Sequence, residues 1–292
     1  MDRQSWTPRG HDLGGGFTVR RALPAAACRS IGPFVFFDHF GPVEAGPDAN
    51  HDVRPHPHIG LATVTYLYEG AMLHRDSTGA VQRIEPGAIN WMTAGRGVVH
   101  SERTPDDLRG RSRRSHGLQL WVGLPEADEE APPSFTHTPA DAIPALEAGG
   151  AQLRVLLGEA FGVRSPVATA SPTLFVDARL AAGDAFPLPL ADERAVYGVD
   201  APFTLDGETV PPFTMVRLAP GEQPLLAAAG DARVALVGGT PLGARHIWWN
   251  FVASRKARIV QAADDWAAGR FAKVPGDTEE FIPLPDRRPT AD

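Results

Sequence analysis

Apolar and polar residues follow one another in short stretches for most of the chain, a pattern typical of β-strands. Ile59 to Tyr68 is rich in β-branched and aromatic residues. Met72 to Arg75 is followed by Val81 to Ile84 across a strong turn sequence, which predicts a hairpin. Further strands are predicted at 17–23, 34–37, 88–93, 97–101 and 118–122. Strands separated by regular turns indicate a sandwich or a barrel.

The second half of the chain repeats this strand-rich character from Leu153 to Gly239, without a clear residue-level repeat. Between the two halves, residues 124–150 are acidic and rich in proline and alanine, which favours a linker. We therefore predict an all-β protein with one domain at 1–123, a linker at 124–150 and a second domain at 151–292.

One helix is predicted near the end of the sequence. Ile259, Ala262 and Trp266 recur at helical spacing, Ser254 is placed to cap the helix, and Gly269 is placed to end it. An apolar stripe of this kind is typical of a helix that packs against a barrel, and a partner-binding helix is the alternative.

Composition supports the all-β prediction and narrows the function. The 292 residues include 30 glycines and 28 prolines, which favours many short strands over long helices. The net charge of −7 makes direct binding to duplex DNA unexpected, because such binding depends on basic patches. The arginine-rich stretch 103–115 is the exception, and we interpret it as a solvated loop rather than a nucleic-acid patch.

The cellular setting also follows from composition. Cys28 stands alone, so neither an intrachain disulfide nor a cysteine-cluster metal site is expected. The sequence contains no run of 18 apolar residues, and residues 1–16 lack the apolar core of a signal peptide. We expect a cytoplasmic protein without a membrane partner.

Two short motifs carry candidate metal chemistry. His56-Pro57-His58 is expected to open the strand at 59–68, and His100-Ser101-Glu102 to end a later strand. Residues i and i+2 of a strand point to the same face, so neighbouring strands would bring three imidazoles and one carboxylate together. That donor set suits a first-row divalent metal with open coordination positions. The alternative is a solvated histidine pair at the start of a strand.

The remaining histidines give weaker signals. His74 is interpreted as a core or surface residue, with support of the metal ligands as the alternative. His39 and His116 are interpreted as structural hydrogen-bonding residues, with a pocket wall as the alternative. After residue 150 the only histidine is His246, so the second domain is expected to hold no metal.

Several long segments resemble the pirin family. They are Gly32 to Pro42 (GPFVFFDHFGP), His56 to Leu67 (HPHIGLATVTYL), Trp91 to Glu102 (WMTAGRGVVHSE), Gly117 to Val122 (GLQLWV) and Pro172 to Phe175 (PTLF). The tail from His246 to Pro285 resembles bacterial pirin-like proteins rather than the animal form. General cupins carry a glutamate shortly after the second histidine, whereas Leu61-Ala62 stands there in this chain.

The resemblance implies a bicupin: two jelly-roll β-barrels with a C-terminal packing helix and one mononuclear iron in the N-terminal barrel. It implies His56, His58, His100 and Glu102 as the ligands of Fe(II), with Mn, Ni, Cu, Co or Zn as possible surrogates.

The resemblance also implies an oxidoreductase, a quercetin 2,3-dioxygenase that opens a flavonol or related enol with O₂. Its partners would be a small aromatic or enol substrate and O₂, and Glu102 would double as the catalytic base. Pirins also act as metal-dependent regulators that dock on transcription factors or metabolic enzymes, so a co-regulator with unknown protein partners is the alternative. A cupin acting on some other enol is a third.

Overall fold

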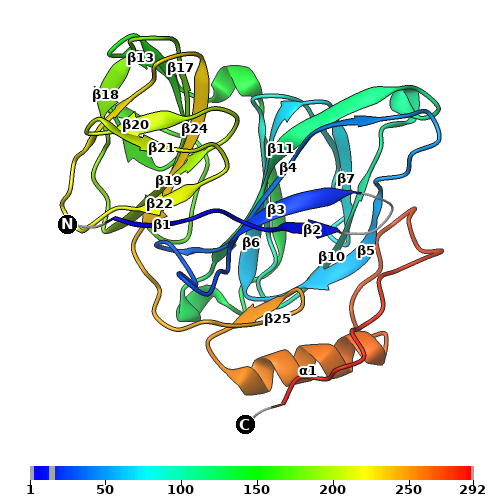
Figure 1. Ribbon diagram of the computed structural model, residues 1–292. Coiled ribbons are helices and arrows are strands. Elements are labelled where there is room, and N and C mark those ends of the chain that lie inside the picture. The colour runs from blue at the N-terminus through cyan, green and yellow to red at the C-terminus, as the bar shows by residue number, and fades with distance from the viewer. Residues whose placement is uncertain (1–2, 13–16, 291–292) are drawn as a thin grey trace. The chain divides into compact units, whose positions relative to one another are not determined.

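Two pairs of β-sheets make up most of the computed structural model, which describes residues 3–12 and 17–290 (Figure 1). By their contacts, the residues divide into a first unit, 1–11, 20–39 and 141–241, and a second unit, 12–19, 40–140 and 242–292. The predicted domains, 1–123 and 151–292 with a linker at 124–150, have different bounds. The predicted bounds remain a prediction about which segments can fold independently.

The first unit is a sandwich of two antiparallel sheets. Its larger sheet has the order β1 (Gln4–Trp6), β22 (Met215–Arg217), β19 (Glu193–Gly198), β24 (Ala232–Gly239), β17 (Thr173–Leu180), β14 (Ala151–Leu157) and β13 (Ala145–Ala148). The smaller sheet has the order β18 (Ala185–Pro187), β23 (Leu225–Ala227), β20 (Phe203–Leu205) and β21 (Glu208–Val210). A short hairpin, β15 (Glu159–Ala160) and β16 (Val163–Arg164), precedes β17. Apolar side chains of both sheets, such as Val176 and Leu226, form one buried core.

The second unit carries the candidate chemistry on its smaller sheet. The larger sheet has the order β12 (Ser134–Thr138), β9 (Ile89–Thr93), β6 (Leu61–Glu69), β11 (Arg113–Gly123), β4 (Phe34–Ala45), β3 (Thr18–Leu23) and β2 (Gly10–Asp12). Residues 10–11, 20–23 and 34–39 of its last three strands are grouped with the first unit by their contacts. The smaller sheet has the order β5 (Val53–His58), β10 (Val98–Arg103), β7 (Met72–Asp76) and β8 (Val81–Ile84). The predicted hairpin at 72–84 is confirmed, with Arg75 paired with Val81.

Residues 124–150, expected to link the domains, contain regular structure. Single 3₁₀ turns occur at η2 (Glu126–Asp128) and η3 (Ala140–Ala142), as at η1 (Asp106–Leu108) earlier in the chain. Strand β12 of this segment pairs with β9 over five residues. Phe135 of this strand is half-buried and Thr138 is buried, so part of the proline-rich segment belongs to the sheet.

The metal motif His56-Pro57-His58 ends β5 rather than opening β6, which corrects one expectation. A turn at Gly60 separates the two strands. Gly60 has a φ of +66°, and a Cβ atom there would lie 2.0 Å from the carbonyl oxygen of Val252. Only glycine permits this left-handed turn with the C-terminal segment so close.

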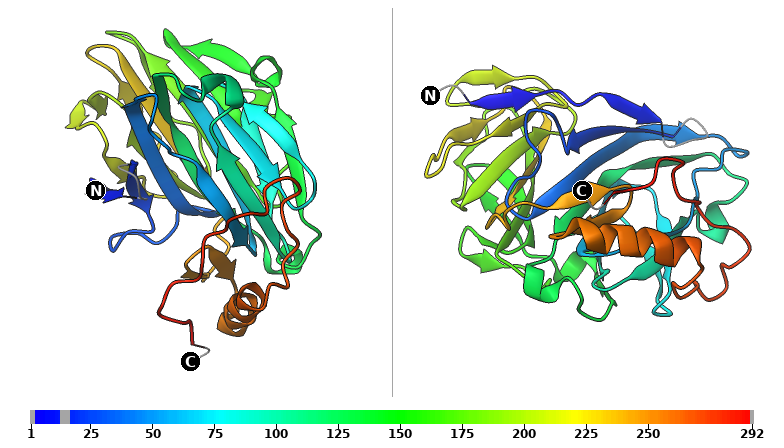
Figure 2. Two further views of the ribbon diagram at one scale, coloured as in Figure 1. Left: turned by 90° about the vertical axis from the view of Figure 1, so that its right-hand side faces the viewer. Right: turned by 90° about the horizontal axis from the view of Figure 1, so that it is seen from below.

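The predicted helix is confirmed as α1 (Lys256–Ala267), which follows the hairpin of β25 (His246–Trp248) and β26 (Phe251–Ala253) (Figure 2). Its buried residues Ile259 and Ala262 pack with Phe251 and with Ile59 of the barrel. Gly269 adopts a left-handed conformation just beyond the helix end. The predicted cap is wrong: the helix begins after Arg255 without a side-chain cap, because Ser254 donates its hydroxyl to Glu129 instead.

Candidate metal centre

Strands β5 and β10 pair in the register that brings the two histidine motifs together. His100 lies opposite His56, and Val98 lies opposite His58. The three histidines are buried, with 7% exposure for His56 and 1% for His58 and His100. The expectation that the two motifs lie on neighbouring strands is therefore correct.

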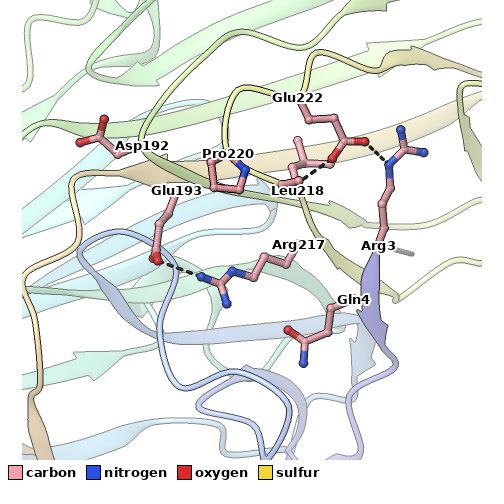
Figure 3. A pocket seen from close by; sticks show the side chains of 9 residues that line it. Arg3, Gln4, Asp192, Glu193, Arg217, Leu218, Pro220 and Glu222 are labelled. Atoms are coloured by element: carbon pink, nitrogen blue, oxygen red, sulfur yellow. Dashed lines mark hydrogen bonds and ion pairs between the residues drawn. The ribbon is translucent and has the colours of Figure 1, made fainter. Parts of the chain in front are cut away.

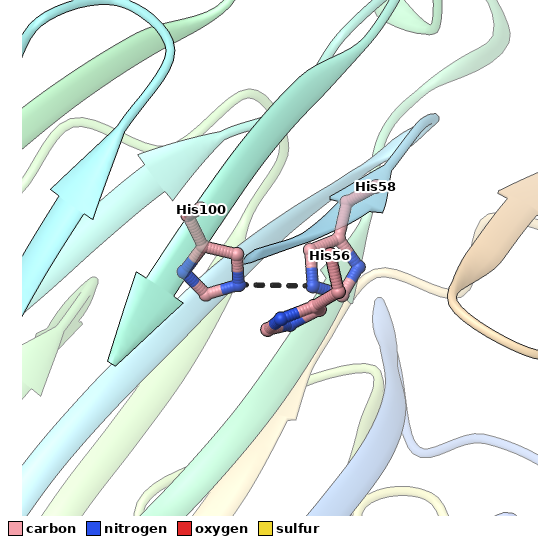
Figure 4. Close-up of side chains that lie close together, drawn as sticks. All are labelled: His56, His58 and His100. Carbon is pink, nitrogen blue, oxygen red and sulfur yellow. Dashed lines mark hydrogen bonds between the residues drawn. The ribbon is translucent and has the colours of Figure 1, made fainter. Parts of the chain in front are cut away.

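The three imidazole rings converge on one point, as Figure 4 shows. Their centroids are 4.3 to 5.0 Å apart, and Nε2 of His58 lies 3.1 Å from Nε2 of His100. One ligand atom from each histidine falls within 4.8 Å of the others. Within residues 3–12 and 17–290, this is the only such group of three or more histidine, cysteine or carboxylate side chains.

Backbone carbonyls orient two of the rings. Nδ1 of His56 donates to the carbonyl oxygen of Arg54 at 2.9 Å, and Nδ1 of His58 donates to that of Asn250 at 3.0 Å. A carbonyl can only accept, so both rings carry their proton on Nδ1 and leave Nε2 with a free lone pair. Nδ1 of His100 is buried and has no hydrogen-bond partner among the described residues.

Burial keeps all three imidazoles neutral near physiological pH. Loss of hydration lowers the pKa of His56 to about 4. It lowers the pKa of His58 and His100 well below the usual value, and repulsion from His56 adds to the effect. Three neutral imidazoles facing one another are suited to a divalent cation, which accepts their lone pairs. The residues present therefore fit a mononuclear metal.

Glu102, the fourth predicted ligand, follows on the same strand but is not part of the group of three. It is part-buried and lies across from Val53 on β5 and from His74 on β7. Loss of hydration raises the pKa of its carboxyl to about 7. Its assignment as a ligand, like that of the three histidines, stays a prediction.

His74 is buried beside this centre. Its Nε2 donates to Oδ2 of Asp76 at 2.8 Å, and its ring lies 5.3 Å from that of His100. His74 also packs in the core, because Phe135 stacks on its ring with centroids 4.4 Å apart. His74 is therefore a core residue, as the sequence predicted, and it also lies next to a predicted metal ligand, which is compatible with the alternative of supporting the ligands.

The other two histidines singled out from the sequence lie apart from the group of three. His39 is fully buried in the first unit, with Nδ1 3.0 Å from the Tyr197 hydroxyl, which agrees with a structural role. His116 is buried beside Tyr68 in the second unit, with ring centroids 4.8 Å apart.

Sequence reasoning missed the contribution of the C-terminal segment to this centre. Asn250 supplies its carbonyl to His58 across 192 positions of sequence. Asp277 accepts a hydrogen bond from Ser101, the residue between His100 and Glu102, at 2.7 Å. No sequence motif identifies which backbone carbonyl accepts a hydrogen bond from a histidine, and a single aspartate near the C-terminal end of the sequence matches no known motif.

A polar pocket of the first unit offers a different chemistry (Figure 3). Arg217 donates to Glu193 at 2.9 Å, and Arg3 donates to Glu222 at 2.5 Å. These two arginines and two glutamates form ion pairs with one another, and the described residues that line the pocket include no histidine of the kind found at the metal centre. None of the described helices is long and apolar enough to cross a membrane.

Two β-sandwich units, one of them with three converging histidines, define a bicupin with a candidate metal centre. The family model described as Pirin matches residues 16–122, and that described as Pirin C-terminal cupin domain matches residues 175–272. The chain belongs to the pirin family.

Known relatives cover nearly the whole chain. A pirin-like protein of Caulobacter vibrioides is 47% identical over 95% of this chain and 97% of its own. The crystal structure of a quercetin 2,3-dioxygenase from Acinetobacter baumannii is 33% identical and covers 99% of this chain and 98% of its own, with a TM-score of 0.89. A second quercetin 2,3-dioxygenase structure from that organism is 28% identical, with a TM-score of 0.85 over 92% of this chain and 97% of its own.

Proposed function

We propose that this protein is a metal-dependent dioxygenase that opens flavonols or related enols with O₂, as quercetin 2,3-dioxygenases do. The observation that carries the proposal is the convergence of three neutral, buried imidazoles within 4.8 Å. The two similar quercetin 2,3-dioxygenase structures from Acinetobacter baumannii support the reaction class.

His56, His58 and His100 are the proposed metal ligands, with Glu102 as the fourth. The carbonyls of Arg54 and Asn250 hold two rings by Nδ1, so that Nε2 faces the centre. When bound, Fe(II) would offer open coordination positions at which a flavonol oxygen and O₂ meet. We propose Fe(II) as the natural ion, with Mn, Ni, Cu, Co or Zn as surrogates.

Glu102 is the proposed base for the 3-hydroxyl of the flavonol. Burial raises the pKa of its carboxyl to about 7 in the metal-free protein. As a metal ligand the carboxyl would be ionised, and by loosening from the ion it would be able to accept the substrate proton. His74 lies opposite Glu102 on β7 and is hydrogen-bonded to Asp76, which fixes its ring. The protein thus supplies metal ligands, a base and a buried setting.

The test is turnover by metal-loaded protein. Wild type loaded with Fe(II) should consume O₂ and release carbon monoxide when quercetin is added, and metal-free protein should do neither. Glu102→Gln that still holds metal should lose more activity than metal. A flavone without the 3-hydroxyl should not react, because it lacks the group that Glu102 deprotonates.

The opposite result is equally specific. Fully loaded wild type that neither consumes O₂ nor releases carbon monoxide with quercetin would refute the dioxygenase assignment. A regulatory role or another enol substrate would then explain the same four residues.

A further inference from the structure

The C-terminal tail, which we define as residues 271–283, contacts both strands that carry the metal ligands. It follows α1 and runs beside β5 and β10 (Figures 1 and 2). The indole Nε1 of Trp266 on α1 donates to the carbonyl oxygen of Ile282 at 3.1 Å. Ile282, near the end of the tail, is therefore held against the helix that precedes the tail in the chain.

Asp277 joins the tail to β10. Its carboxylate accepts a hydrogen bond from the Ser101 hydroxyl at 2.7 Å and two from the Arg103 guanidinium at 2.7 and 2.8 Å. The side chains of Asp277 and Arg103 are only 12% and 13% exposed. A paired, largely buried Arg–carboxylate contact has fixed geometry, unlike a mobile surface ion pair.

Ser101 and Arg103 alternate with the proposed ligands His100 and Glu102 along β10. Since successive side chains of a strand point to opposite faces, Asp277 holds β10 from the face opposite the ligands.

The pairing of β5 with β10 is irregular at this point. His100 lies opposite His56, but Glu102 lies opposite Val53, so two steps on β10 match three on β5. The extra length falls at Arg54 and Pro55. A bulge interrupts the ladder of hydrogen bonds, and proline has no N–H to contribute to it.

The tail also contacts the irregular segment of β5. The N–H of Ile282 donates to the carbonyl oxygen of Pro55 at 2.8 Å. The preceding carbonyl, that of Arg54, is the one that orients His56. The tail therefore contacts both strands at the irregularity between His100 and Glu102. At this point strand pairing alone does not fix the distance between the histidines and Glu102.

We propose that Asp277 is a positioning residue of the metal centre, which sets the place of Glu102 relative to the three histidines by holding Ser101 and Arg103. The inference deepens the proposed function and rests on it. Asp277 is not part of the group of three histidines, so its effect would reach the centre through β10.

The experiment titrates metal-free protein with Co(II), following the heat of binding and the visible absorption of the bound ion. Asp277→Ala should bind Co(II) roughly 10–100-fold more weakly than wild type, as removal of outer-shell support typically does. The absorption bands should also change, because they report the ligand arrangement. Asp265→Ala is the matched control, since Asp265 pairs with Arg270 at 2.6 Å in the same C-terminal segment but is not among the contacts of the metal strands. It should bind like wild type.

A double-mutant cycle separates positioning from general loosening of the structure. In a Glu102→Gln background, Asp277→Ala should cost little further Co(II) affinity, because the group it positions is already impaired. An equal loss in both backgrounds, or wild-type affinity and spectrum in Asp277→Ala, would overturn the proposal.

Three further outcomes also have a defined meaning. If Asp277→Ala does not fold, Ser101→Ala removes one of the three hydrogen bonds and should show the same dependence on Glu102 with a smaller loss. If wild type binds no Co(II), the metal centre of the proposed function fails together with this inference. If wild type binds and the Asp277 variants match it, only this inference fails.

Discussion

At the scale of the residue, the metal centre is an arrangement of buried groups whose protonation is set by burial. His56 and His58 use Nδ1 to contact a backbone carbonyl, so the tautomer that exposes Nε2 is the stable one. Residue identity and i, i+2 spacing were enough to predict that three of these side chains converge. The orienting carbonyls were not predictable, because any residue can supply a carbonyl and only the fold selects Arg54 and Asn250.

Removing one imidazole should abolish metal binding. His100→Ala takes away one of three converging nitrogen ligands, and elemental analysis should fall from about one metal ion per chain to almost none. The overall fold should persist, because His100 is a small part of the barrel core, and circular dichroism would check it. His137 is the control: its ring bonds to Asn90 at 2.7 Å and is not part of the group of three, so His137→Ala should retain metal. A second specifically bound ion in wild type would contradict a single-site protein.

Glu102 gives a pH-dependent prediction for the metal-free protein. Its folded pKa of about 7 exceeds the ordinary value of 4.5, so the folded state binds this proton more tightly than the unfolded state. Stability from this group is therefore complete at low pH and is lost as pH rises from about 4.5 to about 7.

Glu102→Gln cannot ionise and escapes this loss. Relative to wild type, the metal-free variant should gain roughly 2–3 kcal/mol of unfolding free energy across that interval. Urea unfolding of both proteins at a series of pH values measures the difference, and the lowered histidine pKa values, common to both, largely cancel. A difference that does not vary with pH would show that Glu102 is not held protonated by burial.

At the scale of the element, contacts between distant segments decided what sequence patterns left open. The hairpin of β7 and β8 was predictable because its turn, Asp76 to Gly79, is local. The cap of α1 was not, because Ser254 has a competing acceptor 125 positions away in Glu129. Likewise, the sequence predicted that His56 to His58 open the strand that follows them. The turn at Gly60, which lies close to Val252, instead separates β5 from β6.

Glu129 should prove important for the attachment of the C-terminal hairpin. Its carboxylate accepts hydrogen bonds from the N–H and hydroxyl of Ser254 and lies 3.1 Å from Arg245, with both charged side chains less than 10% exposed. Glu129→Ala leaves Arg245 buried without its partner, and we expect a loss of about 3–5 kcal/mol in unfolding free energy.

The neighbouring Glu130 provides the control. It is 51% exposed and pairs with Arg258 at 2.7 Å, so Glu130→Ala should cost less than about 1 kcal/mol. Chemical denaturation of the two variants measures both values. Equal losses of unfolding free energy would mean that burial does not make the Glu129–Arg245 pair contribute more to stability than the exposed Glu130–Arg258 pair.

At the scale of the whole molecule, charge and the use of arginines argue against nucleic-acid binding. The net charge is −7, and arginines of the 103–115 stretch contact the protein itself. Arg103 binds Asp277, Arg109 binds Asp52 at 2.9 Å, and Arg113 donates to the carbonyl of Ala49 at 2.6 Å. Pattern alone could not distinguish such internal contacts from a basic patch, because the acceptors come from distant loops.

We therefore expect no appreciable binding to duplex DNA near physiological salt. A gel-shift titration checks this, with a variant carrying Arg111→Ala, Arg113→Ala and Arg114→Ala for comparison. Tight, salt-sensitive binding by wild type that disappears in the variant would contradict the prediction.

The discontinuous second unit has a consequence for biosynthesis. Residues 40–140 bring the three histidines, but Asn250 and the tail that complete their surroundings belong to 242–292, after the hundred residues of the first unit's last segment. A chain emerging from the ribosome thus presents the histidine strands long before their final supports exist. The finished centre can form only when the last segment packs on the barrel, so we expect a metal ion to reach its final geometry only after residues 242–292 have been translated.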